Sequence, residues 1–342
     1  MEAKRSNLTA TDHLRARLRE HQRENAPAPL KKREIPLVIP ATPAERNWRH
    51  AMWEDRRQKV LKSLQQAGTS HFALLRFTEC GSACTVQWSP SLKKARLRAS
   101  YCHSRHCEPC MRAKANVIAG NLQRKLKERQ PGSYRFITLT LKHTDSPLRD
   151  QVKKLLRCFK KLRQRKEWKT SQVGGVATLE VKWKPAGAIV GETGRQLQID
   201  EWHPHLHVIS EGNWIHWREL RDAWLQITGD STGVDIRQVK DRRECLHYVT
   251  KYISKGCSPS VWNSDEAAAE WILSIKGIRT VSTYGTWRGI SLTKPDNPAN
   301  DWRPICTLQQ LLDACARGEE WAQGMFRQLR PEKEPGQPRG PP

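Results

Sequence analysis

The sequence has no run that approaches the roughly eighteen consecutive apolar residues of a membrane-spanning helix. Residues 1–23 carry charges where a secretory signal peptide needs an uninterrupted apolar core. Internal repeats are also absent. These absences exclude a helical membrane anchor and a secretory leader, so we expect a cytoplasmic protein that does not bind membranes.

Acidic residues are also scarce relative to basic ones. Asp and Glu total 35 against 60 Lys and Arg, which gives a formal net charge of +25. A surplus of this size indicates a polyanionic partner, and nucleic acid is the first candidate. The 14 tryptophans support this view, because indoles among basic residues can stack on the bases of single strands.

The length of 342 residues allows one large or two modest domains. Prolines interrupt residues 26–43, and we interpret residues 1–65 as a basic flexible arm. Residues 66–130 are expected to form a cysteine-rich module with a basic helix, residues 131–258 the main domain, and residues 259–330 a helical region. The Pro- and Gly-rich residues 331–342 are expected to be a disordered tail.

The main domain shows a clear order of strand and helix patterns. β-Branched and aromatic residues or Gly-bounded apolar runs predict strands over residues 134–142, 176–183, 206–209 and 234–239. Apolar residues at helical spacing predict helices over residues 147–167, 217–227 and 242–254. The resulting β-α-β-β-α-β-α order predicts an α+β fold, the ferredoxin-like split βαβ arrangement. Its antiparallel sheet would have the first and third strands side by side at the centre.

Two histidines in HPHLH are candidate metal ligands. Alternate side chains of a strand share a face, so His205 and His207 project together and could hold one divalent ion. Glu180, in the middle of the preceding predicted strand, is our choice for the third ligand, with Glu201 and His203 as alternatives. A carboxylate and two imidazoles suit Mg or Mn with open positions for substrate oxygens. A solvated polar strand face would show the same spacing.

The helix predicted over residues 242–254 carries two tyrosines four residues apart. Tyr248 and Tyr252 would lie on one helix face, with Lys251 and Lys255 beside them. The pair could present two hydroxyl nucleophiles to one cleft if a cation favoured the phenolate. Amphipathic packing is the commoner reason for such spacing.

Four cysteines have the spacing of a structural zinc site. Cys102, Cys107 and Cys110 lie in one tight turn, and Cys80 would approach across a β-hairpin. Four thiolates would close a tetrahedral zinc site that leaves no position for substrate. Cys84, His103 and His106 could replace one ligand, and buried free thiols are the alternative interpretation.

Three of these segments together resemble the motifs of the HUH endonucleases, specifically the rolling-circle replication initiators of small bacterial plasmids. Residues 136–140 (FITLT) resemble their first motif, HPHLHV their metal motif and YVTKYISK their tyrosine motif. Cys80 and the block from Cys102 to Cys110 resemble the cysteines found ahead of the first motif. The resemblance covers about residues 80–255.

The resemblance implies that Tyr252 attacks a phosphodiester of single-stranded DNA, leaving a 5′-phosphotyrosine and a 3′-OH that primes synthesis. His205, His207 and a third residue would hold the ion that neutralises a phosphate oxygen. Lys251 lies beside the nucleophile. Single-stranded DNA, double-stranded origin DNA and a host helicase would be the partners, in the bacterial cytoplasm.

One position departs from this family. Plasmid initiators commonly place a glutamate four residues before the nucleophile, where this chain has Tyr248. Two tyrosines resemble the A protein of small icosahedral phages and the rolling-circle transposases, which leaves open whether Tyr248 or water ends the reaction. A two-tyrosine transposase, a non-catalytic zinc-containing DNA-binding regulator and an RNA-binding module remain as alternative functions.

Overall fold

The structure is a computed structural model that describes residues 53–127, 133–144, 146–190, 195–197, 199–240, 242–292 and 301–329. Residues 1–52 of the expected arm and the expected tail over residues 331–342 lie outside the described residues, whereas residues 54–65 of the expected arm form a helix with buried residues and not a flexible segment. Two compact units are present, and each has its own sheet. None of the described helices is long and apolar enough to span a bilayer.

The larger unit is built on a five-stranded antiparallel sheet with the order β8-β3-β7-β4-β9. Its strands are β3 (Tyr134–Thr140), β4 (Gln172–Lys184), β7 (Glu201–Gly212), β8 (Val234–Val239) and β9 (Val281–Gly285). The first and third of the predicted strands, β3 and β7, are indeed central neighbours. The predicted mixed α+β fold with an antiparallel sheet is therefore confirmed.

The helices of this unit lie close to their predicted positions. They are α5 (Glu108–Lys127), α6 (Leu148–Leu162), α7 (Lys166–Ser171), α8 (Trp217–Thr228), α9 (Arg242–Lys255) and α10 (Asp265–Ser274). The helix predicted over residues 147–167 ends at Leu162, and α7 follows as a separate short helix. Gly229 adopts a left-handed backbone (φ +84°) and ends α8, as its lack of a Cβ allows.

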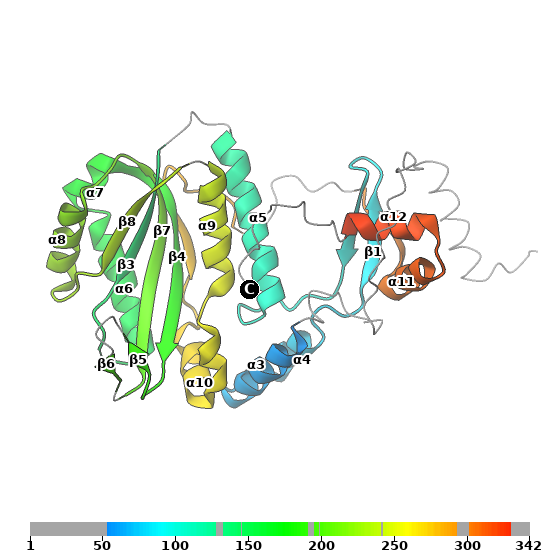
Figure 1. Cartoon of the computed structure of the whole chain (residues 1–342), viewed down its shortest axis with the longest axis horizontal. Helices are drawn as coiled ribbons and strands as arrows, with labels where there is room; N and C mark the ends of the chain where they lie inside the picture. The colour runs from blue at the N-terminus through cyan, green and yellow to red at the C-terminus, as the bar shows by residue number, and fades with distance from the viewer. Residues whose placement is uncertain are drawn as a thin grey trace, which may run out of the picture. The chain divides into compact units, whose positions relative to one another are not determined.

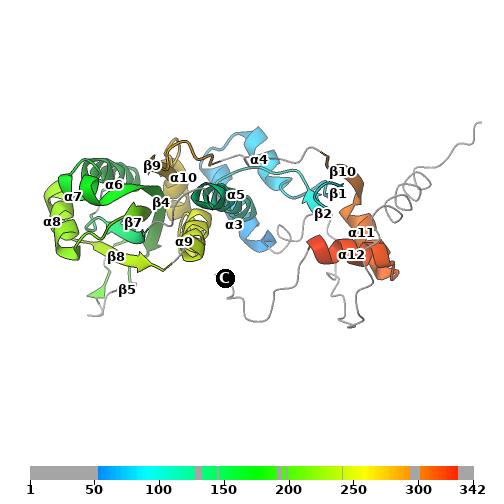
Figure 2. The same cartoon turned by 90° about the horizontal axis from the view of Figure 1, so that it is seen from above.

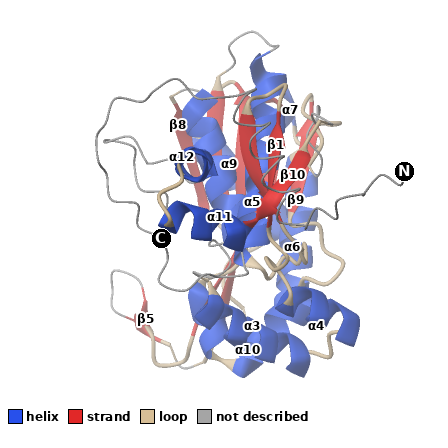
Figure 3. Ribbon diagram, turned by 90° about the vertical axis from the view of Figure 1, so that its right-hand side faces the viewer, coloured by secondary structure: helices blue, strands red, loops and turns tan. Residues whose placement is uncertain are grey.

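The sheet is covered on both faces (Figure 2). Phe136 and Ile209 belong to a buried apolar cluster with residues of α5 and α9, which pack against each other (Figures 1 and 3). The neighbouring residues Ile137 and Val208 are fully buried and point to the opposite face, which α6 covers. Since His205 and His207 alternate with Leu206 and Val208, both imidazoles lie on the α9 face.

Two features of this unit did not follow from the sequence patterns. β9 pairs with β4 at the edge of the sheet and comes from the region expected to be helical. β7 extends well beyond the short strand predicted over residues 206–209 and begins at Glu201. The longer strand brings Glu201, His203, His205 and His207 into one row on the same face.

The smaller unit contains a three-stranded sheet with the order β10-β1-β2. β1 (Thr85–Ser89) and β2 (Lys94–Arg98) form a hairpin, and β10 (Arg303–Thr307) pairs with β1. Helices α11 (Leu308–Ala316) and α12 (Glu320–Leu329) supply the rest of its apolar core. Thr307 caps α11 in a capping box with Gln310. Helices α3 (Glu54–Gln66) and α4 (His71–Thr78) precede this hairpin in the chain.

Candidate functional site

The two predicted metal histidines stand side by side on β7, and threonines of β3 orient both rings. Thr140 Oγ1 lies 2.9 Å from His205 Nδ1, and Thr138 Oγ1 lies 3.2 Å from His207 Nδ1. These hydrogen bonds join residues that face each other directly across the β3–β7 pair. Because Nδ1 is occupied in both rings, Nε2 is the nitrogen left for another partner.

Glu180 lies on β4, the strand that flanks β7 on the side opposite to β3. In the register of β4 and β7, Glu180 lies directly opposite His205. Its carboxylate is nevertheless hydrogen-bonded to His207, the diagonal neighbour, whose Nε2 donates to Glu180 Oε2 over 2.8 Å. Glu180 and His207 are both buried, with 7% and 9% of their side chains exposed. The predicted third ligand thus contacts one of the two histidines directly.

Burial and hydrogen bonding set the protonation states here. Burial alone would raise the pKa of Glu180, but the hydrogen bond and charge of His207, with Lys182 and Lys255, outweigh it and lower the pKa. Burial lowers the pKa of His205 to about 4, and the positive charge of Lys182 acts in the same direction. Glu180 is therefore a carboxylate and His205 a neutral imidazole at neutral pH.

The two tyrosines of α9 lie on the same face of the sheet as the histidines. The Tyr252 ring stacks on His207, with 3.7 Å between the ring centroids and 28° between the planes. Phe136 of β3 stacks with both phenols, at 4.6 Å from Tyr248 and 5.3 Å from Tyr252. Both tyrosines are half-buried and their rings are nearly parallel, at 12°. The structure therefore brings the tyrosine and histidine motifs together.

The two lysines of this helix differ in what they contact. Lys251 Nζ lies 5.3 Å from the centre of the Tyr252 ring, within the range of a cation–π contact. Lys255 is exposed, and its Nζ lies 3.9 Å from Glu180 Oε1. Burial, with the charges of Glu180 and Tyr248, raises the pKa of Tyr252, so the phenol is protonated at neutral pH in this arrangement.

Among the described residues, two groups of side chains could hold a metal ion. Within each group every residue offers one ligand atom, and these atoms all lie within 4.8 Å of one another. The first is the predicted set Cys80, Cys102, Cys107 and Cys110, and the second is His143, Glu201 and His203. His205, His207 and Glu180 are not one of these groups. Their side chains bond to Thr140 and to each other instead.

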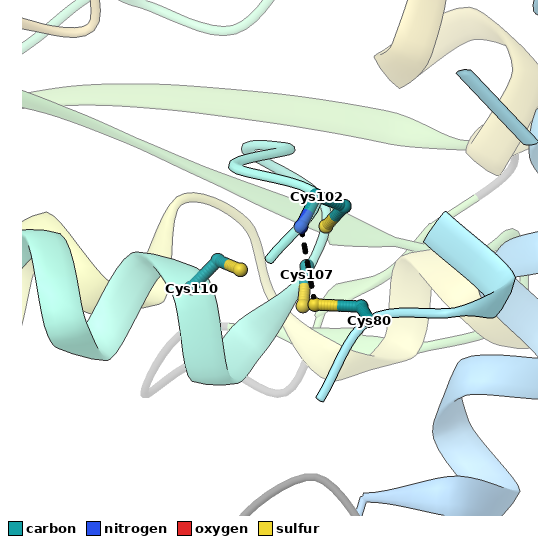
Figure 4. Close-up of side chains that lie close together, drawn as sticks. All are labelled: Cys80, Cys102, Cys107 and Cys110. Carbon is teal, nitrogen blue, oxygen red and sulfur yellow. Dashed lines mark hydrogen bonds between the residues drawn. The ribbon is translucent and has the colours of Figure 1, made fainter. Parts of the chain in front are cut away.

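The cysteine cluster has the donor set and the backbone of a zinc site (Figure 4). No disulfide joins its members, and all but Cys102 are buried. The backbone N–H of Cys102 donates to Cys80 Sγ over 3.4 Å, and Gly81 provides the left-handed turn (φ +87°) next to Cys80. These thiols fit a tetrahedral ion, which would stabilise the loop that precedes α5.

The alternative fourth ligands considered from the sequence are not members of this cluster. Cys84 belongs to the apolar core of the smaller unit, where burial raises its pKa to about 11. His106 packs edge-on against Trp262 and Trp271, and burial lowers its pKa to about 3.

The sequence motifs missed three residues of the site, namely Thr138, Thr140 and His143. Thr138 and Thr140 alternate in FITLT, so the period-two pattern of a strand next to the histidine strand could have indicated them. His143 follows β3 in an irregular segment, and no spacing rule relates it to β7.

Two helices rich in basic residues could follow DNA phosphates, and they lie on different faces of the sheet. α6 (Leu148–Leu162) covers the face opposite the tyrosines, whereas α5 (Glu108–Lys127) packs beside α9 (Figure 2). Arg112 of α5 pairs with Glu108 over 2.6 Å, so part of this charge is neutralised within the helix.

Comparison with known proteins assigns the chain to a family. The family model described as "Replication protein" matches residues 93–302, which is more than half of the chain. The chain belongs to the replication protein family. This match covers the whole histidine and tyrosine site. No solved structure matches the chain.

Two curated relatives of this replication protein have matching regions. "Protein rep" of Bacillus amyloliquefaciens is 29% identical over 181 residues, which are 49% of this chain and 50% of the relative. "Protein rep" of a Bacillus species is 28% identical over 177 residues, 48% of this chain and 54% of the relative. The chain thus spans about half the length of the curated relatives it matches.

Proposed function

We propose that this protein is a plasmid replication initiator that nicks and rejoins single-stranded origin DNA through Tyr252. The observation that supports the proposal is the contact between the Tyr252 ring and His207, because it brings the candidate nucleophile of α9 close to the proposed metal ligands. Membership of the replication protein family supports the same activity. The bacterial cytoplasm is the expected location.

In the proposed reaction the Tyr252 oxygen attacks phosphorus and forms a phosphotyrosine bond to the 5′ end of the strand downstream of the nick. The bond from phosphorus to the 3′ oxygen breaks, and that oxygen takes up a proton to become the 3′-OH primer. The phenol must lose its proton on the way, and its raised pKa opposes this loss. Lys251 lies near the ring and would stabilise negative charge there.

The residues around the histidines fit a divalent ion of the Mg or Mn class. His207 Nε2 and Glu180 Oε2 already face each other, and His205 Nε2 is left for a ligand role because its Nδ1 bonds Thr140. When bound, such an ion would neutralise a phosphate oxygen and align the phosphorus for in-line attack. Thr138 and Thr140 would fix the ring orientations, and Lys255 would offset the charge of Glu180.

Tyr248 is the reason for a second candidate function, that of a two-tyrosine transposase. Tyr248 stacks on the same Phe136 ring as Tyr252, so a second phenol is available for a later strand transfer. A genomic position between transposon ends would favour the transposase, and one beside a replication origin would favour the initiator. We propose that the zinc cluster and the basic helix α5 bind origin DNA and that a host helicase unwinds the duplex from the nick.

A labelled single-stranded origin oligonucleotide provides the decisive experiment. We expect incubation with the protein and Mn²⁺ to give a species that migrates slowly on a denaturing gel and that disappears after protease digestion. Tyr252→Phe should abolish this adduct, and His205→Ala/His207→Ala should abolish it as well because the proposed metal ion can no longer bind. An adduct of equal yield in Tyr252→Phe would refute the role of this tyrosine, and no adduct with any variant would favour the non-catalytic regulator.

A further inference from the structure

A second cluster of potential ligands lies at the start of β7, outside the proposed nicking site. Glu201 Oε1 lies 3.4 Å from His143 Nε2, and Glu201 Oε2 lies 3.2 Å from His203 Nε2. The two imidazole rings are 5.6 Å apart. Each oxygen of the Glu201 carboxylate therefore faces a different ring nitrogen. One carboxylate oxygen and the two nitrogens all lie within 4.8 Å of one another.

The side chains of this cluster are largely buried. The Glu201 side chain is only 3% exposed, and those of His143 and His203 are 21% and 22% exposed. A buried carboxylate needs charge compensation or full hydrogen bonding. Nε2 of His203 is buried and makes no well-directed hydrogen bond within the described residues, although it points at Glu201. A cation at the centre would be within reach of the carboxylate and both ring nitrogens at once.

We propose that His143, Glu201 and His203 form a binding site for one divalent transition-metal cation, distinct from the site at His205, His207 and Glu180. Two imidazoles and one carboxylate form a donor set that Zn²⁺, Co²⁺ and Mn²⁺ accept with open positions for water or phosphate oxygens. The ion would also tie β7 to the segment that follows β3. This inference does not depend on the nicking chemistry.

The spacing along β7 keeps the two sites apart. His203 precedes His205 by two residues and His207 by four, which corresponds to roughly 7 and 13 Å along an extended strand. Metal pairs that act on one phosphate lie about 3.5–4 Å apart. The second ion would therefore not share the scissile phosphate, but it would place positive charge on the same face of the sheet.

Cobalt titration of the full-length protein, supplied with only the one equivalent of zinc that the cysteines require, tests the site. We would use His205→Ala/His207→Ala as the background, because this variant removes the proposed nicking site, and zinc occupies the cysteines. We expect this background to bind one equivalent of Co²⁺, with weak visible absorption bands and no thiolate charge-transfer band. Adding His143→Ala or His203→Ala should abolish this binding, and Glu201→Gln should weaken it by about tenfold or more.

His71→Ala in the same background is the matched control, because His71 is an exposed histidine at the start of α4. It should leave cobalt binding unchanged. The proposal is overturned if the background binds no Co²⁺, or if the His143, His203 and Glu201 variants bind as the background does. Far-UV circular dichroism verifies folding, and Glu201→Gln preserves side-chain size if an alanine variant unfolds. Lost nicking with retained cobalt binding would separate the two sites.

Discussion

The phenol ring of Tyr252 lies on the imidazole of His207, with ring centroids 3.7 Å apart. Tyr248, one helical turn earlier, instead stacks on Phe136 at 4.6 Å. The two phenols are 6.4 Å apart and nearly parallel, so they share one environment but differ in their distance to the histidines. This difference gives Tyr252 the better position for the first attack.

Removing each phenol separately should therefore have unequal effects. We expect Tyr252→Phe to reduce single-turnover nicking by at least about 10³-fold, because Tyr248 stacks on Phe136 and not on the histidines and would replace the nucleophile poorly. Tyr248→Phe should leave the first cleavage within a fewfold of the parent and impair rejoining. Quench-flow assays with oligonucleotides measure both steps. Equal loss of first cleavage in the two variants would contradict the assigned order.

The threonines of β3 should control metal affinity without contacting the ion. Thr138→Val removes the hydrogen bond to His207 while keeping the shape of the side chain. We expect Mn²⁺ to bind about 10–100-fold more weakly, as for other lost ring-orienting partners. Thr138→Ser retains the hydroxyl and should bind Mn²⁺ as the parent does. Isothermal titration measures both affinities, and unchanged binding in Thr138→Val would refute this role.

Charge on the two faces of the sheet should contribute differently to DNA binding. We expect Lys251→Gln/Lys255→Gln on α9 to weaken binding to single strands and to reduce the salt slope by about 0.7 for each phosphate that is no longer neutralised. Lys153→Gln/Lys160→Gln removes the same charge from exposed positions of α6, on the opposite face, and should have little effect. Fluorescence anisotropy at several salt concentrations compares them. An equal reduction in both variants would indicate DNA binding on both faces.

The ten cysteines should separate into groups by their reactivity. Burial raises the pKa of Cys84 and Cys315 to about 11 and that of Cys306 to about 12. At pH 8 about one in a thousand of the Cys84 and Cys315 thiols and about one in ten thousand of the Cys306 thiols is a thiolate, and that fraction rises as the pH rises toward the pKa. We expect iodoacetamide to leave them unmodified at pH 8 while the protein is folded.

The zinc cysteines should respond to a chelator instead. We expect Cys80, Cys102, Cys107 and Cys110 to be protected in the metal-loaded protein and alkylated after zinc removal. Peptide mass spectrometry of samples with and without chelator shows both groups in one experiment. Alkylation of the four cysteines at the same rate in both samples would contradict a metal-binding role.

Trp224 links the core to the histidine site. It is fully buried, and its indole N–H donates to the Thr140 carbonyl over 2.9 Å. Trp224→Phe removes this hydrogen bond and leaves a cavity, so we expect the free energy of unfolding to fall by about 2–4 kcal/mol. Urea denaturation measures this change. Trp217→Phe, at an exposed position of α8, is the control and should cost much less.

The sequence predicted the parts of this protein that depend on local periodicity. β8 matches its predicted range of residues 234–239, and the cysteines come together as predicted because three of them lie in one turn. The neighbouring positions of β3 and β7 followed from the element order. In each case the relevant contacts are close in sequence or fixed by a common fold rule.

The features that depend on distant pairing did not follow from the sequence. β9 is short and bounded by residues of mixed polarity, and its partner β4 lies more than a hundred residues earlier. The diagonal bond from His207 to Glu180 required the exact register of β4 and β7, which no motif contains. His143 reached Glu201 only because the chain turns after β3.

The pairing of β10 with β1 has a consequence for synthesis of the chain on the ribosome. Residues 85–98 leave the exit tunnel early, but the strand that completes their sheet and the two helices of their core come from residues 303–329. The hairpin must therefore wait with an open edge until residues 303–329 have been synthesised. A premature stop codon before Arg303 would leave that edge exposed to other nascent chains.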